Sequence, residues 1–258
     1  EKGEEFKHRN GAGFRVAGMW DKVIDLNQCH LQAEPSNEIR KSARDYAIEN
    51  ELDFFDIAQQ EGFLRNLTIR MSSNGQIMVL IQFFYEDTDK REGLLNHLHT
   101  KFPEITSLLY TINSKGNESI FDLDILTFKG EDYIFEEMEG LKFKIGPKSF
   151  YQTNSLQAYE LYKITREFAQ INKDDIVYDL YTGTGTIAQF VAENAKKVVG
   201  VESVPEAIAA AKENAENNNI ENCNFYVGDM KKIFTENFIN ENGKPDIVIT
   251  DPPRDGMH

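Results

Sequence analysis

The sequence predicts an α/β fold in its second half, built on a parallel sheet covered on both faces, preceded by a smaller α+β region. From about residue 149 onward, short apolar strands alternate with helical stretches, a rhythm typical of strand–helix–strand units. Before that point, strand-like runs follow one another around turn residues, with two helical stretches between them. We therefore expect two domains, residues 1–148 and 149–258.

The first region is predicted to hold hairpins and two helices. A helix over 35–50 places Ile39, Ala43, Tyr46 and Ala47 on one face, and a second helix over 90–102 is stopped by a proline. The clearest turn signal is the Asn-Gly pair at 74–75, which is typical of a β-hairpin. Hairpins or strand pairs are predicted over 13–26, 65–87, 105–121 and 132–154.

The second region alternates four helices with four strands. Asn154 is the expected N-cap of the first helix, which carries Leu161, Ile164, Phe168 and Ile171 on one face. A proline begins the third helix. The helices are predicted over 154–171, 186–195, 205–218 and 230–238, and the strands over 176–181, 197–202, 223–227 and 246–251.

The composition is that of a soluble globular protein, with 40% hydrophobic and 28% charged residues. No apolar run approaches the ~18 residues that a membrane span needs, and no signal segment opens the chain. The net charge of −15 counts against a basic nucleic-acid-binding surface on this chain. Two distant cysteines, Cys29 and Cys223, cannot form a disulfide framework, which favours a reducing, cytoplasmic location.

A glycine-rich turn follows the strand over 176–181. Gly183, Gly185 and Ala188 spell G-x-G-x-x-A between a strand and a helix, where backbone N–H groups and a helix N-terminus can face a ligand. Glu202 ends the next strand, 17 residues after Gly185, where a carboxylate can accept hydrogen bonds from both hydroxyls of a ribose. This arrangement predicts a nucleotide-type cofactor.

Electrostatics favours S-adenosylmethionine over NAD as that cofactor. Asp179 lies on the strand itself, and a carboxylate repels a pyrophosphate but attracts the sulfonium and amino groups of S-adenosylmethionine. Asp229 ends the third strand, where it can accept a hydrogen bond from an adenine amino group or cap the next helix. The residues that end strands and so converge on one rim are Tyr181, Glu202, Asp229 and Asp251.

Four motifs, SFYQTN, DLYTGTGT, VVGVES and ITDPPRDG, closely resemble the RNA (uracil-5-)-methyltransferase family in order and spacing. This family makes 5-methyluridine in 23S rRNA and tRNA. The resemblance covers 148–258 well and extends more loosely to a central domain over 1–147. It implies a Rossmann-like S-adenosylmethionine methyltransferase sheet preceded by an α+β domain on the RNA side.

The resemblance also assigns site residues. The family's cofactor contacts fall on Gln152, Tyr181, Glu202 and Asp251, with Thr186 and Asp229 at two further cofactor-side positions. Tyr181 is expected to pack against the methionine part, and Asp251 heads a Pro-Pro turn that stays stiff beside the substrate base. The complete predicted cofactor site is Gln152, Tyr181, Gly183, Gly185, Thr186, Glu202, Asp229 and Asp251.

The family's chemistry implies residues that this sequence lacks. A cysteine thiolate adds to C6 of the uracil, C5 then attacks the methyl group, and a base removes the C5 proton. That cysteine and that base lie downstream of the DPPR motif, so both are expected beyond His258, and we expect an inactive fragment with a C-terminally truncated sheet. Cys223 begins a strand at the opposite end of the sheet and is expected to be a small core residue.

Cys29 matches the last of four iron–sulfur ligands in cluster-bearing relatives. A cubane cluster needs four thiolates, so a free thiol is expected here and a cluster only in a longer chain. The match favours 23S rRNA over tRNA as the substrate, while His30 is expected to be an ordinary polar residue. RNA is the expected partner, and the strand over 246–251 becomes a sheet edge that can pair with another chain.

Three other functions remain open from the sequence. A base-amino methyltransferase also uses a D/N-P-P turn and needs no cysteine. The G-x-G-x-x-A motif is also compatible with an NAD-dependent oxidoreductase, although Asp179 and the DPPR motif are evidence against that function. The third is a binding module without catalytic activity.

Overall fold

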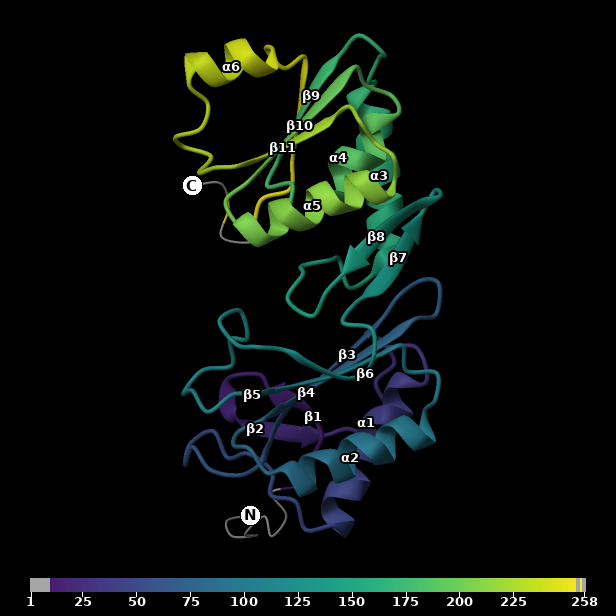
Figure 1. Ribbon diagram of the computed structural model, residues 1–258, viewed down its shortest axis with the longest axis vertical. Coiled ribbons are helices and arrows are strands. Elements are labelled where there is room, and N and C mark those ends of the chain that lie inside the picture. Colours follow the sequence, from purple (N-terminus) through teal and green to yellow (C-terminus); the bar gives the residue numbers. More distant parts are fainter. Residues whose placement is uncertain (1–9, 254–255, 257–258) are drawn as a thin grey trace. The chain divides into compact units, whose positions relative to one another are not determined.

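A computed structural model describes residues 10–253 and residue 256 (Figure 1). The chain divides into two compact units. Unit 1 holds the described residues up to Met71 together with Gly75–Ile134, and unit 2 holds Ser72–Asn74 and the described residues from Phe135 onward. No helix in the described part is both long and apolar enough to cross a membrane.

Unit 1 is an α+β unit, as predicted. Its sheet has the order β3-β4-β5-β6, in which β4 and β5 run parallel and the outer pairs run antiparallel. A separate two-stranded sheet joins β1 to β2. The elements are β1 Gly13–Val16, β2 Met19–Asp25, α1 Ser36–Glu49, β3 Leu64–Met71, β4 Ile77–Phe83, α2 Thr88–Lys101, β5 Ser107–Ile112 and β6 Leu126–Gly130.

The core of unit 1 lies between the sheet and its two helices. Ile39 and Ala47 of α1 are fully buried, as their spacing predicts, and Leu95 of α2 packs in the same cluster. The side chain of Asp87 caps α2 by accepting a hydrogen bond from the backbone N–H of Lys90. Because α2 connects two parallel strands, it forms the crossover that parallel pairing requires.

The predicted strand pair over 105–121 is wrong in its second half. Only the first half is a strand, β5, and it pairs with β4 in parallel rather than with the residues directly after it. Its antiparallel partner, β6, begins at Leu126. The intervening residues are held instead by Arg65, whose guanidinium donates to the carbonyl oxygens of Asn113, Lys115 and Asn117.

Unit 2 contains a hairpin followed by a parallel sheet with four helices. The hairpin joins β7 Ile134–Met138 to β8 Leu141–Ile145, and the sheet has the order β11-β10-β9-β12. Asn154 caps α3, as predicted, by accepting from the backbone N–H of Gln157. The remaining elements are α3 Ser155–Ala169, β9 Ile176–Leu180, α4 Thr186–Ala192, β10 Lys197–Glu202, α5 Pro205–Asn217, β11 Cys223–Val227, α6 Glu236–Asn242 and β12 Ile247–Thr250.

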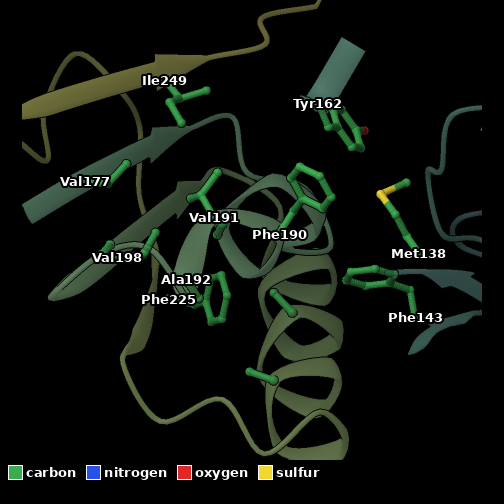
Figure 2. Packing of buried hydrophobic residues seen from close by; sticks show 14 of the residues in the cluster. Met138, Phe143, Tyr162, Val177, Phe190, Val191, Ala192, Val198, Phe225 and Ile249 are labelled. Carbon is green, nitrogen blue, oxygen red and sulfur yellow. The ribbon is translucent and has the colours of Figure 1, made fainter. Parts of the chain in front are cut away.

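The sheet of unit 2 is parallel throughout and covered on both faces, which confirms the predicted fold class. On one face, Val177 and Val198 pack with Phe190 of α4 and with residues of α3 and α5 (Figure 2). On the other face, Tyr178 and Val199 pack against residues of α6 and the segment before it. Alternate residues of each strand therefore face different helices.

The compact units divide between Ile134 and Phe135, not at the 148/149 boundary expected from the sequence. The reason is the β7–β8 hairpin, which packs Met138 and Phe143 into the core of unit 2 (Figure 2). The backbone N–H of Lys144 also donates to Asn214 Oδ1 in α5 at 2.7 Å. The hairpin lies outside the strand–helix alternation that defined the second region in the sequence, so the sequence pattern did not indicate that it packs there.

Two helices of unit 2 differ from their predicted form. The helix expected over 230–238 begins at Glu236, because Thr235 caps it and the residues before it form turns. The second difference is the buried face of α3, which consists of Ala158 and Tyr162 rather than the predicted residues. Of the expected apolar face, Leu161, Ile164 and Phe168 are exposed among the described residues.

Candidate functional site

The carboxyl ends of the four parallel strands form one rim. The register pairs Thr250 with Leu180, Val201 with Leu180, and Glu202 with Val227, so the residues just beyond these pairs are neighbours. The backbone N–H of Asp251 donates to the carbonyl oxygen of Leu180 at 3.4 Å. Glu202 ends β10, and Tyr181 and Asp251 directly follow β9 and β12, so all three lie at the ends of neighbouring strands, as the sequence predicts.

The turn between β9 and α4 has left-handed backbone conformations at three positions. The φ angles are +63° at Tyr181, +54° at Gly183 and +77° at Gly185. Glycine adopts such angles freely, but a side chain such as that of Tyr181 costs roughly 1 kcal/mol or more. The local strain at Tyr181 lies directly where the strand meets the rim, which is a common property of ligand-contacting turns.

The two glycines of the turn have different surroundings. A Cβ atom at Gly183 would have no heavy atom within 4 Å, so open space lies beside its backbone. A Cβ atom at Gly185 would lie 2.9 Å from the ring of Phe225 and 3.0 Å from Ala211 Cβ. Gly183 thus leaves its backbone open to a ligand, whereas Gly185 lets α4 pack against β11 and α5.

Glu202 is fixed in place by the backbone around it. Its Oε1 accepts from the backbone N–H groups of Ser203 and Val204, at 2.6 and 3.1 Å, and from the Ser203 hydroxyl at 2.9 Å. Its Oε2 accepts from the backbone N–H of Gly183 at 3.3 Å. One oxygen therefore orients the side chain, and the other meets the glycine turn with acceptor capacity to spare.

Asp179 lies beneath the turn rather than on the rim surface. It is fully buried, and its Oδ2 accepts from the Thr182 hydroxyl at 2.5 Å and from the backbone N–H of Ala188 at 3.0 Å. Its Oδ1 has no hydrogen-bond partner. The pKa of Asp179 is raised to about 7, mainly by burial and to a smaller extent by the charges of Asp251 and Glu202, while the two hydrogen-bond donors act in the opposite direction.

The sequence indicated Asp179 only as a charge near the cofactor and did not indicate Thr182 at all. Both are structural anchors of the turn, since Thr182 also donates its backbone N–H to the carbonyl oxygen of Val201 at 3.1 Å. The spacing of Asp179 and Thr182 in the sequence could have indicated this contact, because a carboxylate can accept a hydrogen bond from a hydroxyl three residues later across a tight turn.

Gln152 and Asp251 meet although 99 residues separate them in the chain. The Gln152 amide nitrogen donates to Asp251 Oδ2 at 3.4 Å. Two prolines, Pro252 and Pro253, follow Asp251 and fix φ in this stretch. Arg254 and Asp255 of the same motif lie outside the described residues.

The last two predicted site residues occupy different environments. Thr186 begins α4 and is buried, and its hydroxyl lies 3.4 Å from that of Thr184. Asp229 is exposed and accepts from the backbone N–H of Lys231 at 2.9 Å, a bond that lowers its pKa. The residues that follow form turns, so the predicted helix-cap role of Asp229 is replaced by a local turn.

The two cysteines lie away from the rim. Cys223 begins β11 at the amino end of the sheet, as predicted, where burial raises its thiol pKa to about 12. Cys29 is buried in unit 1, and the Asn37 side chain bonds to both its backbone N–H and its carbonyl oxygen. Within the described residues, no three His, Cys, Asp or Glu side chains are arranged to hold a metal ion.

Together, these groups form an acidic site at the end of a parallel sheet. Asp179, Glu202 and Asp251 place three carboxyl groups around a turn whose Gly183 leaves its backbone open. Such a site attracts a cationic ligand and repels a pyrophosphate. The carboxyl end of a parallel sheet is also where ligands bind in open α/β folds.

Known proteins resemble the chain in both sequence and structure. A family model described as a methyltransferase domain matches residues 171–254. A protein from Porphyromonas gingivalis named as an uncharacterized RNA methyltransferase is 56% identical over 252 residues, which cover 97% of this chain and 54% of that protein. A protein of the same name from Bacteroides thetaiotaomicron is 55% identical over 257 residues, covering 98% of this chain and 57% of that protein.

Among solved structures, the tRNA (uracil-54, C5)-methyltransferase of Pyrococcus abyssi in complex with S-adenosyl-L-homocysteine matches with a TM-score of 0.77. It is 26% identical, and the match covers 97% of this chain and 58% of that one. The chain spans a little over half the length of the curated relatives it matches. The protein belongs to the family of these RNA methyltransferases, and its second unit has the fold of S-adenosylmethionine-dependent methyltransferases.

Proposed function

We propose that the chain holds S-adenosylmethionine for the methylation of uracil C5 in RNA, forming 5-methyluridine. The observation that carries this proposal is the acidic rim around Gly183, Glu202 and Asp251. The relatives are about twice as long as the aligned part, so the reaction is proposed for the whole protein. The bound S-adenosylmethionine would supply an activated methyl group on a positively charged sulfur.

The residues present fit this cofactor. Oε2 of Glu202 can accept from the ribose hydroxyls, because Oε1 already holds the side chain in place. The open backbone at Gly183 allows close approach, and Tyr181 can pack against the methionine part. The carboxyl groups of the rim favour the sulfonium and amino charges, whereas they would repel the pyrophosphate of NAD.

Asp251 and Gln152 are proposed to serve the side of the site that faces the substrate base. The hydrogen bond between them ties the segment before α3 to the end of β12. The two prolines after Asp251 keep this segment stiff, so that a base splayed out of its stack meets a preformed surface. We propose Thr186 and Asp229 as further positions on the cofactor side, with Asp229 facing the adenine amino group.

The RNA substrate is proposed to be 23S rRNA, because Cys29 matches a cluster ligand of rRNA-modifying relatives. A tRNA substrate is the second candidate, since the solved structure with 26% identity is a tRNA enzyme. An iron–sulfur cluster, if one is bound by a longer chain, would take Cys29 as one ligand. A cytoplasmic location agrees with either RNA.

Two experiments test the proposal. Calorimetry on this chain should give heat for S-adenosylmethionine and S-adenosyl-L-homocysteine and none for NAD, while tighter NAD binding would reject the cofactor assignment. Methyl transfer from labelled S-adenosylmethionine by the full-length Porphyromonas gingivalis relative should label uridine in 23S rRNA. Label found in tRNA would favour the second candidate, and label on a base amino group would reject the C5 reaction.

Self-association is a separate proposal about unit 2. Among the described residues, β12 pairs with β9 alone and forms an edge of the sheet. Val248 in this strand is 53% exposed, and an apolar edge strand is a template for pairing. We expect a dimer of this chain through 246–251 in light scattering, which replacement of Val248 by lysine should convert to monomer.

A further inference from the structure

Asp179 is a titratable group buried beneath the glycine turn. It lies on β9 with no exposed surface, directly beneath the glycine turn. Oδ2 takes hydrogen bonds from Thr182 at the turn and from Ala188 in α4, while Oδ1 takes none. A buried carboxyl with one saturated and one empty oxygen can exist with or without its proton, since neither state satisfies every group.

The charged groups that act on Asp179 come from the neighbouring elements. Glu202 ends β10 and Asp251 follows β12, and both carry charge of the same sign as an ionised Asp179. Tyr162 of α3 and Cys223 of β11 also interact electrostatically with Asp179. Burial, with a smaller contribution from Asp179, raises the pKa of each to about 12, so both stay neutral at physiological pH. From α4, Asp179 receives only the N–H of Ala188, among the contacts described.

We propose that Asp179 is a positioning residue that couples cofactor binding to the release of one proton from beneath the glycine turn. In the free protein, burial opposes ionisation of Asp179 most strongly, and the two rim carboxylates add to that effect. A cationic cofactor at the rim offsets their charge, and the resulting Asp179 carboxylate strengthens its bonds to Thr182 and Ala188. The turn is thereby held most firmly when the cofactor is bound. This inference depends on the proposed function, because it requires a cationic cofactor at this rim.

The direction of the pH effect follows from the state of Asp179. With a pKa of about 7 in the free protein, Asp179 is mostly protonated below neutrality. A bound cation lowers that pKa, so binding near pH 6.5 should release up to one proton. Affinity should therefore rise about tenfold from pH 5.5 to pH 8 and level off above pH 7.5. S-Adenosyl-L-homocysteine lacks the sulfonium charge and should release fewer protons.

Calorimetry on this chain tests the coupling directly. S-Adenosylmethionine is titrated at pH 6.5 in buffers of different ionisation enthalpy, which gives the number of protons released, and affinities are measured from pH 5.5 to 8. Asp179→Asn should bind with an affinity that changes less than about twofold over this range. Asp174→Asn is the matched control, because it removes one exposed carboxylate at the other end of β9 and should retain the wild-type pH dependence.

The outcomes separate this inference from the proposed function. Binding with an affinity independent of pH and no proton release would overturn the coupling and leave the cofactor assignment intact. No binding of S-adenosylmethionine at any pH would overturn both. A folded Asp179→Asn protein with the wild-type pH dependence would also overturn the coupling.

A measurement without ligand tests the protonation of Asp179 itself. In the folded protein, burial raises the pKa of Asp179 to about 7. The protonated Asp179 therefore contributes fully to stability below about pH 4, and this contribution is lost as the pH rises through 7. The Tm of the wild-type chain should therefore fall relative to that of Asp179→Asn between pH 5 and pH 8. A Tm difference that stays constant over this range would show that Asp179 is already ionised in the free protein, and would overturn the inference.

Discussion

The two ends of the parallel sheet in unit 2 use their polar groups differently. At the amino end, Asp246 Oδ2 accepts from the backbone N–H of Ile176 at 2.9 Å, and the Tyr178 hydroxyl donates to the carbonyl oxygen of Gly243 at 2.7 Å. Lys197 donates to both the backbone and side-chain oxygens of Asn242. Each of these groups connects one element to another, so this end of the sheet is closed by the protein itself.

At the carboxyl end, comparable groups keep unused capacity. Asp179 has an oxygen without a partner, and Gly183 has open space beside its backbone. Asp251 is exposed, with one long hydrogen bond from Gln152. Polar groups at the amino end therefore stabilise the fold. At the carboxyl end, Gly183 and Asp251 are accessible to a ligand, and Asp179 lies buried beneath them. Substitutions at the two ends should separate stability from binding.

The largest effect should come from Gly185. We expect Gly185→Ala to lower the free energy of unfolding by about 3 kcal/mol, because it combines a positive φ with overlap against Phe225 and Ala211. Denaturation in urea measures the change. Gly183→Ala is the matched control, with a positive φ and no overlap, and should cost about 1 kcal/mol. Equal losses for the two variants would refute the distinction between an open and a packed glycine.

The next effect concerns binding at the carboxyl end. Glu202→Ala should weaken S-adenosylmethionine binding by about 1–3 kcal/mol, because the ribose hydroxyls would lose a charged acceptor. The same change removes the bonds to Gly183, Ser203 and Val204, so folding must be checked by circular dichroism. Unchanged affinity in calorimetry would remove Glu202 from the cofactor site.

At the amino end, we expect a substitution to lower stability and leave cofactor binding unchanged, with a smaller effect than the two above. Tyr178→Phe removes only the hydroxyl that donates to Gly243, and should lower the free energy of unfolding by about 1 kcal/mol. Its affinity for S-adenosylmethionine should stay within twofold of wild type. A loss of binding without a loss of stability would contradict the division between the two ends.

The smallest effect is expected for Cys223. Its thiol is protonated below about pH 12, and it lies at the amino end, so it should act as a small packing residue. Cys223→Ala should leave cofactor affinity unchanged, and the wild-type thiol should react slowly with alkylating reagents at pH 8. Rapid alkylation that abolishes cofactor binding would place this cysteine near the site.

Several features of the site could be predicted because they depend on local chemistry. The spacing of Gly183, Gly185 and Glu202 follows from the needs of a strand–turn–helix unit, and the structure places all three around the turn. Asn154 caps its helix through a bond to a residue three positions away. Interactions of this range are encoded in adjacent residues, so a single sequence is sufficient to indicate them.

The meeting of Gln152 with Asp251 was less accessible to pattern reasoning. These residues are 99 positions apart, and only the family resemblance placed them in one site. The difference between the two glycines was not predicted either, because both adopt a positive φ and differ only in what surrounds them. Such surroundings depend on which elements pack nearby.

Apolar periodicity and turn residues act within a few positions of the chain, so they were sufficient to predict the parallel sheet, the approximate ends of its strands and the acidic rim. Packing between elements distant in the chain places the β7–β8 hairpin in unit 2, and it leads α3 to bury Ala158 and Tyr162 rather than Leu161, Ile164 and Phe168. The same packing buries Asp179 and leaves one of its oxygens without a hydrogen-bond partner. Burial is a property of the whole packed unit, since it depends on the shape of every element that covers a side chain.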